Sequence, residues 1–167
     1  SAEQVQGADR GMRVPDDADR DFTAGCIVVN DRDEVLLVNH SKLGMWLQPG
    51  GHVEEREVPS ETALRETREE TGWKVEIFDE FVPETSYQDV TEDVPTPFRM
   101  NLHRIEDGHF HLESLFLASP VEKVEATGAD EHDGVGWFAE SELDGLETPE
   151  NLRSAVSEAL KIGERTQ

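Results

Sequence analysis

The chain has 167 residues, of which 38 are acidic and 15 basic, so that its formal net charge is -23 at pH 7. This length suits one domain with a core, and the negative charge argues against nucleic-acid backbones and anionic membranes as partners, because like charges repel. No segment resembles a signal peptide or a membrane span. With Cys26 as the single cysteine an internal disulfide is excluded, and we expect a cytoplasmic protein.

Lysine is scarce in this acidic chain. The lysines are Lys42, Lys74, Lys123 and Lys161. Acid excess with scarce lysine is the composition expected of a protein from a salt-loving organism, a halophile, where ions screen the surface charges. An ordinary acidic protein is the alternative.

The first part of the chain changes from polar to apolar. Residues 1–21 lack large apolar side chains, which predicts a flexible N-terminal arm ahead of a single domain over residues 22–163. Residues 22–30 and 34–38 are apolar and β-branched on either side of a polar turn, and this pattern predicts a β-hairpin.

A helix is predicted from Pro59 to just before Gly72, since proline suits the first helical position and glycine suits the residue after the last. Glu66 and Glu70 would lie one turn apart on one face, with Glu69 close by. Carboxylates this close repel one another unless a cation lies among them, and oxygen-only ligands suit Mg²⁺, Mn²⁺ or Ca²⁺. From these residues alone, a solvated acidic helix is the alternative.

The turn Pro49-Gly50-Gly51 comes just before this helix, and its bare backbone can approach a ligand closely. A backbone carbonyl there could add an oxygen to the metal. The local pattern therefore indicates a divalent-cation site built on a loop, a helix and a second loop.

The remaining segments alternate between strand-like and loop-like composition. Strands are predicted at 74–78, 98–105, 110–118 and 135–138, with a loop excursion at 79–97, an acidic loop-rich stretch at 121–133 and a final amphipathic helix from Thr148-Pro149. Strands between two helices predict an α/β protein, a helix–sheet–helix sandwich.

The region from Gly51 to Gly72 resembles the signature of the Nudix hydrolase family, G-x5-E-x7-R-E-x-x-E-E-x-G. The matching residues are Gly51, Glu57, Arg65, Glu66, Glu69, Glu70 and Gly72. Even at roughly one in ten per position, a chance match anywhere in the chain is about one in 10⁵. Thr67 and Trp73 stand where aliphatic residues are usual, and neither removes a ligand. The resemblance implies the Nudix fold, an α/β/α sandwich with a mixed central sheet.

The resemblance also implies a reaction. Family members cleave a nucleoside diphosphate linked to another group by water attack on phosphorus, with Mg²⁺ or Mn²⁺ as cofactor. By position, Glu66, Glu69 and Glu70 resemble the metal ligands, with the Gly50 carbonyl as a further one. Glu66 or Glu69 would orient or deprotonate water, although a general base outside the signature stays open. A catalytically silent nucleotide sensor is the alternative, against which the intact glutamates argue.

Two further pairs carry expectations. Arg65 and Glu57 would form an ion pair that fixes the loop against the helix, with a solvated pair as the alternative. The resemblance implies an additional late acid at the metal. Glu131 is favoured over Asp133, and solvated loop acids are the alternative.

The histidines near the end of the predicted sheet are a separate group. His109 and His111 alternate on a strand and share a face with Glu113, while His103 would lie on the neighbouring strand. These histidines could contact substrate, hold a transition metal or be ordinary polar residues. His52, beside the signature glycine, could touch phosphate or metal. A small-molecule diphosphate substrate is implied; its identity and homodimer formation stay open.

Overall fold

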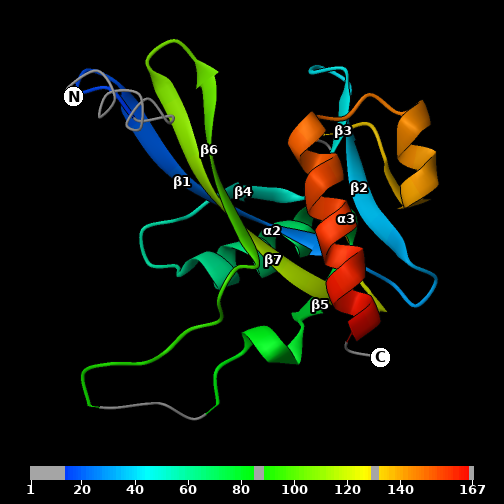
Figure 1. The fold of residues 1–167 in the computed structure, drawn as a ribbon. Helices are drawn as coiled ribbons and strands as arrows, with labels where there is room; N and C mark the ends of the chain where they lie inside the picture. Colours follow the sequence, from blue (N-terminus) through cyan, green and yellow to red (C-terminus); the bar gives the residue numbers. More distant parts are fainter. Residues whose placement is uncertain (1–13, 85–88, 129–131, 166–167) are drawn as a thin grey trace, which may run out of the picture.

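The computed structural model describes residues 14–84, 89–128 and 132–165. Within them lie two sheets and two α-helices (Figure 1). The elements are β1 (Asp19–Val28), β2 (Glu34–His40), β3 (Met45–Leu47), β4 (Gly50–His52), α2 (Pro59–Thr71), β5 (Trp73–Ile77), η1 (Asp79–Phe81), β6 (Arg99–Glu106), β7 (His109–Lys123), β8 (Val135–Ala139), η3 (Glu140–Gly145) and α3 (Glu150–Arg165).

The larger sheet is mixed, as expected. Its strands follow the order β4-β1-β7-β5, with β6 also paired to β7, and a second sheet has the order β3-β2-β8. Strand β1 runs parallel to β7 and antiparallel to β4. The 15-residue β7 pairs with β6 along its first part and with β5 along its second.

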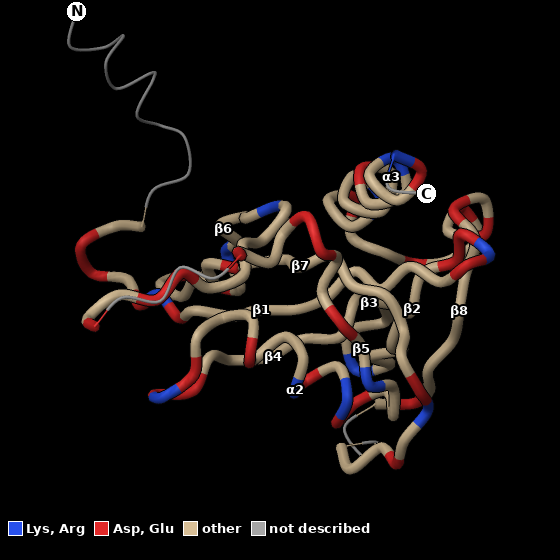
Figure 2. Tube along the Cα trace, turned by 90° about the horizontal axis from the view of Figure 1, so that it is seen from below, with Lys and Arg blue, Asp and Glu red and all other residues tan. Residues whose placement is uncertain are grey.

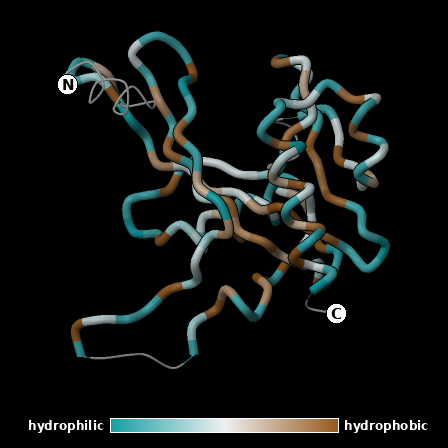
Figure 3. Tube along the Cα trace, viewed as in Figure 1, coloured by the Kyte–Doolittle hydropathy of each residue, from teal (hydrophilic) through white to brown (hydrophobic). Residues whose placement is uncertain are grey.

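The two helices cover opposite sides of the larger sheet (Figure 2). On β1, Ile27 packs in one core cluster with Val156 of α3. Cys26 points the other way and packs with Ala63 of α2. Burial raises the pKa of the Cys26 thiol to about 12, which makes it an inert core residue. The layers confirm the predicted α/β/α sandwich, and the hydrophobic residues gather along the central strands (Figure 3).

The predicted hairpin between the first two strands is wrong. The turn between them is present, because the Asn30 side-chain oxygen accepts from the backbone N–H of Arg32 and Glu34. Among the described residues, however, β1 and β2 share only the isolated bridge between Val29 and Val35. Strand β7 already occupies one edge of β1 and β4 part of the other, so β2 continues into the second sheet.

Two strands are longer than their composition suggests. Strand β1 begins at Asp19, so that Asp19–Asp21, assigned above to the arm, pair with β7. Strand β7 ends at Lys123, opposite Trp73 of β5, inside a stretch predicted to be loop-rich. Backbone pairing with a neighbouring strand extends a strand through polar residues that have little strand preference of their own.

Acidic residues are spread over loops, strands and helices, with fewer basic residues among them (Figure 2). No helix in the described part of the chain is long and apolar enough to span a bilayer.

Candidate active site

The helix with the signature glutamates forms where the sequence predicts it. Helix α2 starts at Pro59 and ends before Gly72, whose φ of 73° is the left-handed conformation that favours glycine. Thr67, one of the two departures from the family pattern, is fully buried and its hydroxyl donates to the Ala63 carbonyl oxygen at 2.7 Å. A hydroxyl is accepted at this core position because the helix backbone satisfies it.

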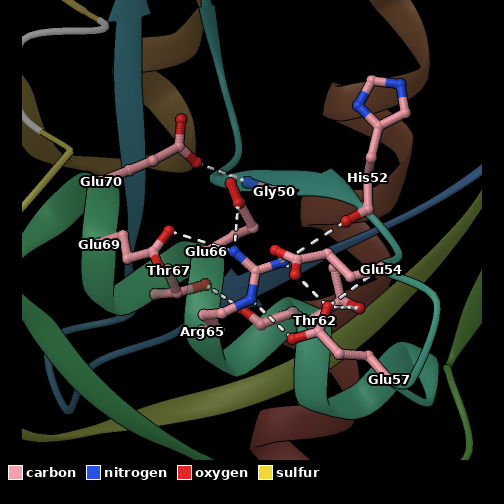
Figure 4. Close-up of polar contacts among 11 residues, drawn as sticks. Gly50, His52, Glu54, Glu57, Thr62, Arg65, Glu66, Thr67, Glu69 and Glu70 are labelled. Carbon is pink, nitrogen blue, oxygen red and sulfur yellow. Dashed lines mark hydrogen bonds and ion pairs between the residues drawn. The ribbon is translucent and has the colours of Figure 1, made fainter.

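Arg65 is the centre of a carboxylate network on this helix (Figure 4). Its Nε and Nη2 donate to the two oxygens of Glu57 at 2.6 and 2.9 Å. Nη1 donates to Glu66 at 2.8 Å and to Glu69 at 3.2 Å, and Nη2 lies 3.2 Å from Glu54. The predicted Arg65–Glu57 ion pair is therefore present, and it is partly buried, with exposed fractions of 27% and 18%.

The two-point contact has an electrostatic consequence. Hydrogen bonding from Arg65 lowers the pKa of Glu57 to about 2, and the same contact raises the pKa of Arg65. One arginine thus offsets the repulsion among several carboxylates and holds them in fixed positions.

The glycine turn meets the helix at two points. The Gly50 N–H donates to Glu70 Oε1 at 2.8 Å, and Glu70 is only 4% exposed. A Cβ at Gly51 would lie 2.4 Å from the carboxyl carbon of Glu66. Because the backbone at Gly51 lies this close to the Glu66 carboxylate, a residue without a side chain is needed there.

A cavity of about 570 Å³ opens at this junction. The predicted site residues that line it are Gly50, His52, Arg65, Glu66, Glu70 and His111. Glu57, Glu69 and His109 are not part of its lining. Glu57 instead holds Arg65 in place, and the Glu69 side chain is 41% exposed.

Four strands present polar side chains on the cavity side of the larger sheet. His111 pairs with Asp21 of β1 on one side and with His103 of β6 on the other. Thr23 pairs with both Glu113 of β7 and His52 of β4. Directly opposed residues in a sheet point to the same face, so the predicted shared face of His109, His111 and Glu113 also includes Asp21 and His52.

Asp21 was missed by the sequence analysis, which placed it in the N-terminal arm. His109 Nε2 lies 2.7 Å from Asp21 Oδ2, and this hydrogen bond lowers the pKa of Asp21. Burial lowers the pKa of His111, and the nearby His52 and His109 add to the effect. The alternation of acids at Asp19 and Asp21 ahead of an apolar run was the available sequence signal.

Glu113 is held between two amides in the cavity. It accepts from Gln48 Nε2 at 3.0 Å and from Asn101 Nδ2 at 3.1 Å, and burial raises its pKa. Neither amide had a sequence signal, because each belongs to a different strand or turn and only the fold brings them to Glu113.

A late loop is attached to the C-terminal end of α2. The Gly128 N–H donates to the Glu69 carbonyl oxygen at 2.7 Å. The Gly134 N–H donates to His132 Nδ1, which leaves Nε2–H to donate to the Glu70 carbonyl oxygen at 2.6 Å. These contacts bring both ends of the loop to the helix.

The two late acids have different outcomes. Asp133 is exposed, bonds to Ser41 and is not part of the cavity lining. Glu131, the favoured extra ligand, lies outside the described residues.

The donor chemistry of the residues present suits a hard divalent cation. Glu66 and Glu70 supply carboxylate oxygens at the cavity, and Glu69 lies beside them on the same helix. The bare backbone of Gly51 leaves the room that the Glu66 carboxylate occupies. An all-oxygen donor set is the one that Mg²⁺ and Mn²⁺ prefer.

Comparison with known proteins gives a family match over most of the chain and partial matches to two relatives. The family model described as the NUDIX domain matches residues 19–159. Over 58 residues the chain is 39% identical to a putative 8-oxo-dGTP diphosphatase of Bacillus subtilis, which covers 34% of this chain and 39% of that protein. Over 54 residues it is 39% identical to an 8-oxo-dGDP phosphatase of Danio rerio, covering 30% of this chain and 17% of that protein. The matches thus span well under two thirds of these relatives' own length.

Solved structures extend the similarity to the whole fold. A NUDIX-family hydrolase from Clostridium perfringens superposes with a TM-score of 0.71 at 25% identity, covering 86% of this chain and 98% of that one. An Ap4A hydrolase from C. elegans has a TM-score of 0.65 at 17% identity, covering 88% and 99%. The second likeness shows the fold alone.

Proposed function

Because the chain belongs to the NUDIX family of diphosphate-bond hydrolases, we propose that it hydrolyses a nucleoside diphosphate linked to another group, in a reaction that depends on Mg²⁺ or Mn²⁺. The observation that carries the proposal is the cavity of about 570 Å³ on which Glu66, Glu70 and Arg65 converge. This volume is in the range that binds small-molecule ligands.

Glu66, Glu69, Glu70 and the Gly50 carbonyl would hold the metal. When bound, the metal supplies positive charge against the phosphate oxygens and makes water a stronger acid. Glu131 remains a proposed additional ligand. Without a cation, the net charge of -23 would repel a diphosphate, which is why a metal cofactor suits this chain.

The surrounding residues set the positions of these carboxylates. Arg65 orients Glu66 and Glu69 through Nη1, and Glu57 fixes Arg65 by a two-point contact. We therefore assign Arg65 and Glu57 as positioning residues in the catalytic network. Side chains held in one geometry before substrate arrives avoid reorganisation during the reaction.

Glu66 and Glu69 are the two candidates for orienting or deprotonating the attacking water. Glu66 lines the cavity and its side chain is 17% exposed, whereas Glu69 does not line it. A general base must reach the water beside the substrate. Glu66 is therefore favoured over Glu69 for orienting or deprotonating water.

The substrate is proposed to be a nucleotide. The relatives from Bacillus subtilis and Danio rerio are named for 8-oxo-dGTP and 8-oxo-dGDP, which supports a purine nucleotide with a diphosphate bond. His52 and His111 line the cavity and are the proposed contacts to it, whereas His109 would act from outside the lining.

A panel of substrates tests the proposal. Phosphate or pyrophosphate release is measured for 8-oxo-dGTP, dGTP, nucleotide sugars and a dinucleoside polyphosphate, with and without Mg²⁺ or Mn²⁺, at low and high KCl. Hydrolysis of at least one compound only with metal is the expected result. Binding of a nucleotide without turnover of any compound at either salt concentration would favour the alternative, a catalytically silent sensor.

A further inference from the structure

Three imidazoles and one carboxylate gather at the edge of the cavity, away from the glutamates of α2. Asp21 on β1 and His111 on β7 are register partners, and His109 lies two residues before His111. His52 comes from β4, on the other side of β1. In the close-up its ring points away from Glu69 and Glu70 (Figure 4). The term histidine cluster is used below for Asp21, His52, His109 and His111.

The Nε2 atoms of the cluster converge on one oxygen. Asp21 Oδ2 lies 2.7 Å from His109 Nε2, 3.4 Å from His52 Nε2 and 3.9 Å from His111 Nε2. The donor atoms of Asp21, His109 and His111 all lie within 4.8 Å of one another. Two ligands about 2.0 Å from a tetrahedral ion are roughly 3.3 Å apart. To bind one ion, the 2.7 Å hydrogen bond from His109 to Asp21 would open, and the 3.9 Å spacing of His111 would close.

The protein alone does not satisfy this cluster. Asp21 Oδ2 has one contact of normal hydrogen-bond length, to His109. His111 Nε2 is buried and has no hydrogen-bond partner among the residues that the structure describes. A buried polar atom without a partner is unusual in a native fold and calls for a partner such as an ion or a water molecule.

The imidazole rings also pack edge to face. Their ring centroids are 5.0 Å apart for His52 and His111, and 5.1 Å for His109 and His111. Protonated rings at this distance would repel, whereas neutral rings present lone pairs to a cation.

We propose that Asp21, His109 and His111 bind a divalent transition metal of the Zn²⁺ type, so that these histidines would meet a substrate through the ion. His52 Nε2 lies 3.4 Å from Asp21 Oδ2 but not within 4.8 Å of all three donor atoms, so it becomes a fourth ligand only after a side-chain movement. The site is distinct from the oxygen-only site of Glu66, Glu69 and Glu70, because imidazole nitrogen suits Zn²⁺ and related ions while carboxylates alone suit Mg²⁺.

An acid next to the cluster fits the same assignment. Glu106 Oε1 lies 3.9 Å from His109 Nδ1, the ring nitrogen that faces away from Asp21. This distance is too long for a hydrogen bond, so Glu106 would have to move closer to orient the ring and raise its basicity as such carboxylates do.

The test is a Co²⁺ titration of the whole chain after removal of metals with a chelator. Co²⁺ replaces Zn²⁺ as the probe, because Zn²⁺ is a d¹⁰ ion and gives no visible absorption band to follow. Excess Mg²⁺ is present throughout to occupy the glutamate site. We expect a visible absorption band that saturates at one Co²⁺ per chain and is abolished by competing Zn²⁺. Equilibrium dialysis measures the stoichiometry independently.

Variants assign the binding to the cluster. Asp21→Asn and His111→Gln should each weaken Co²⁺ binding at least about tenfold, the smallest loss typical even of residues that only support ligands. His103→Gln is the matched control, because His103 lies opposite His111 in the sheet but is exposed and outside the cluster. Its binding should stay unchanged. His109→Gln replaces His111→Gln if the latter does not fold.

Three results would overturn the proposal: no Co²⁺ bound in excess Mg²⁺, equal binding by wild type and the cluster variants, or binding lost in Glu66→Gln and retained in Asp21→Asn. The last outcome would place the ion at the glutamates. Because no substrate is present in the titration, the result is independent of whether the chain hydrolyses diphosphates.

Discussion

Gly51 and Glu66 share one space: a Cβ on Gly51 would lie 2.4 Å from both the carboxyl carbon and Oε2 of Glu66. The Gly51→Ala variant must therefore displace the carboxylate from the cavity. We expect kcat/KM to fall roughly 100-fold, because displacement of a reacting group by about 1 Å has that effect.

Gly145→Ala is the matched control, since a Cβ there meets no atom within 4 Å. It should keep wild-type activity, and thermal melts should show both variants folded. Wild-type kcat/KM in a folded Gly51→Ala variant would contradict the role given to Glu66.

The Glu70→Gln variant separates charge from shape at the proposed metal site. The amide oxygen of glutamine can still accept from the Gly50 N–H, so the fold should be kept. Loss of the negative charge should lower turnover to less than about a tenth of wild type and weaken Mg²⁺ binding by a similar factor. Steady-state kinetics over a Mg²⁺ series measures both. A folded variant above that level would remove Glu70 from the ligand set.

The Glu57–Arg65 pair should make stability depend on acid pH. The pKa of Glu57 is lowered from 4.5 to about 2 in the folded chain, so the folded state binds fewer protons than the unfolded state between these values. The stabilisation is complete above about pH 4.5 and is lost as the pH falls toward about 2.

We therefore expect Glu57→Gln to lower Tm by several degrees at neutral pH, and the difference from wild type to shrink between about pH 4.5 and about pH 2. Glu55→Gln, an exposed neighbour on the same loop, is the control and should follow wild type. A Tm difference that stays constant over this pH range would rule out the ion pair as its source.

Salt should stabilise the chain without any divalent ion. With a net charge of -23, repulsion among surface carboxylates opposes the compact state. Raising KCl from about 0.1 M to about 1 M shortens the Debye length from about 10 Å to about 3 Å and screens this repulsion. Tm measured by calorimetry in chelator should rise clearly over this range. A flat or falling Tm would count against the halophile interpretation and leave the hydrolase proposal untouched.

The helix with its glutamates could be read from the sequence because its determinants are local. Pro59 and Gly72 mark its ends, and residues three or four apart on a helix are neighbours whatever the rest of the chain does. Arg65 and Glu69, four residues apart, meet for the same reason. The predicted Arg65–Glu57 pair joins this helix to the loop that precedes it.

The sheet depended on choices that no local pattern contains. Residues 22–38 look like a hairpin, yet β1 and β2 belong to different sheets, because strand pairing is decided by which edges remain open in the whole fold. Asp21 looked like part of a polar arm for the same reason. Its partner His109 is 88 residues away, and only the parallel pairing of β1 with β7 brings them together.

The functional residues of the chain therefore fall into two groups: those placed by local sequence and those placed by tertiary structure. The glutamates proposed to bind a cation lie on one helix, so sequence spacing alone placed them near one another. Glu113 between Gln48 and Asn101, and the histidine cluster across β4, β1 and β7, arise only from tertiary structure. Burial and register, which act over the whole sheet, decide which of those polar side chains face one another.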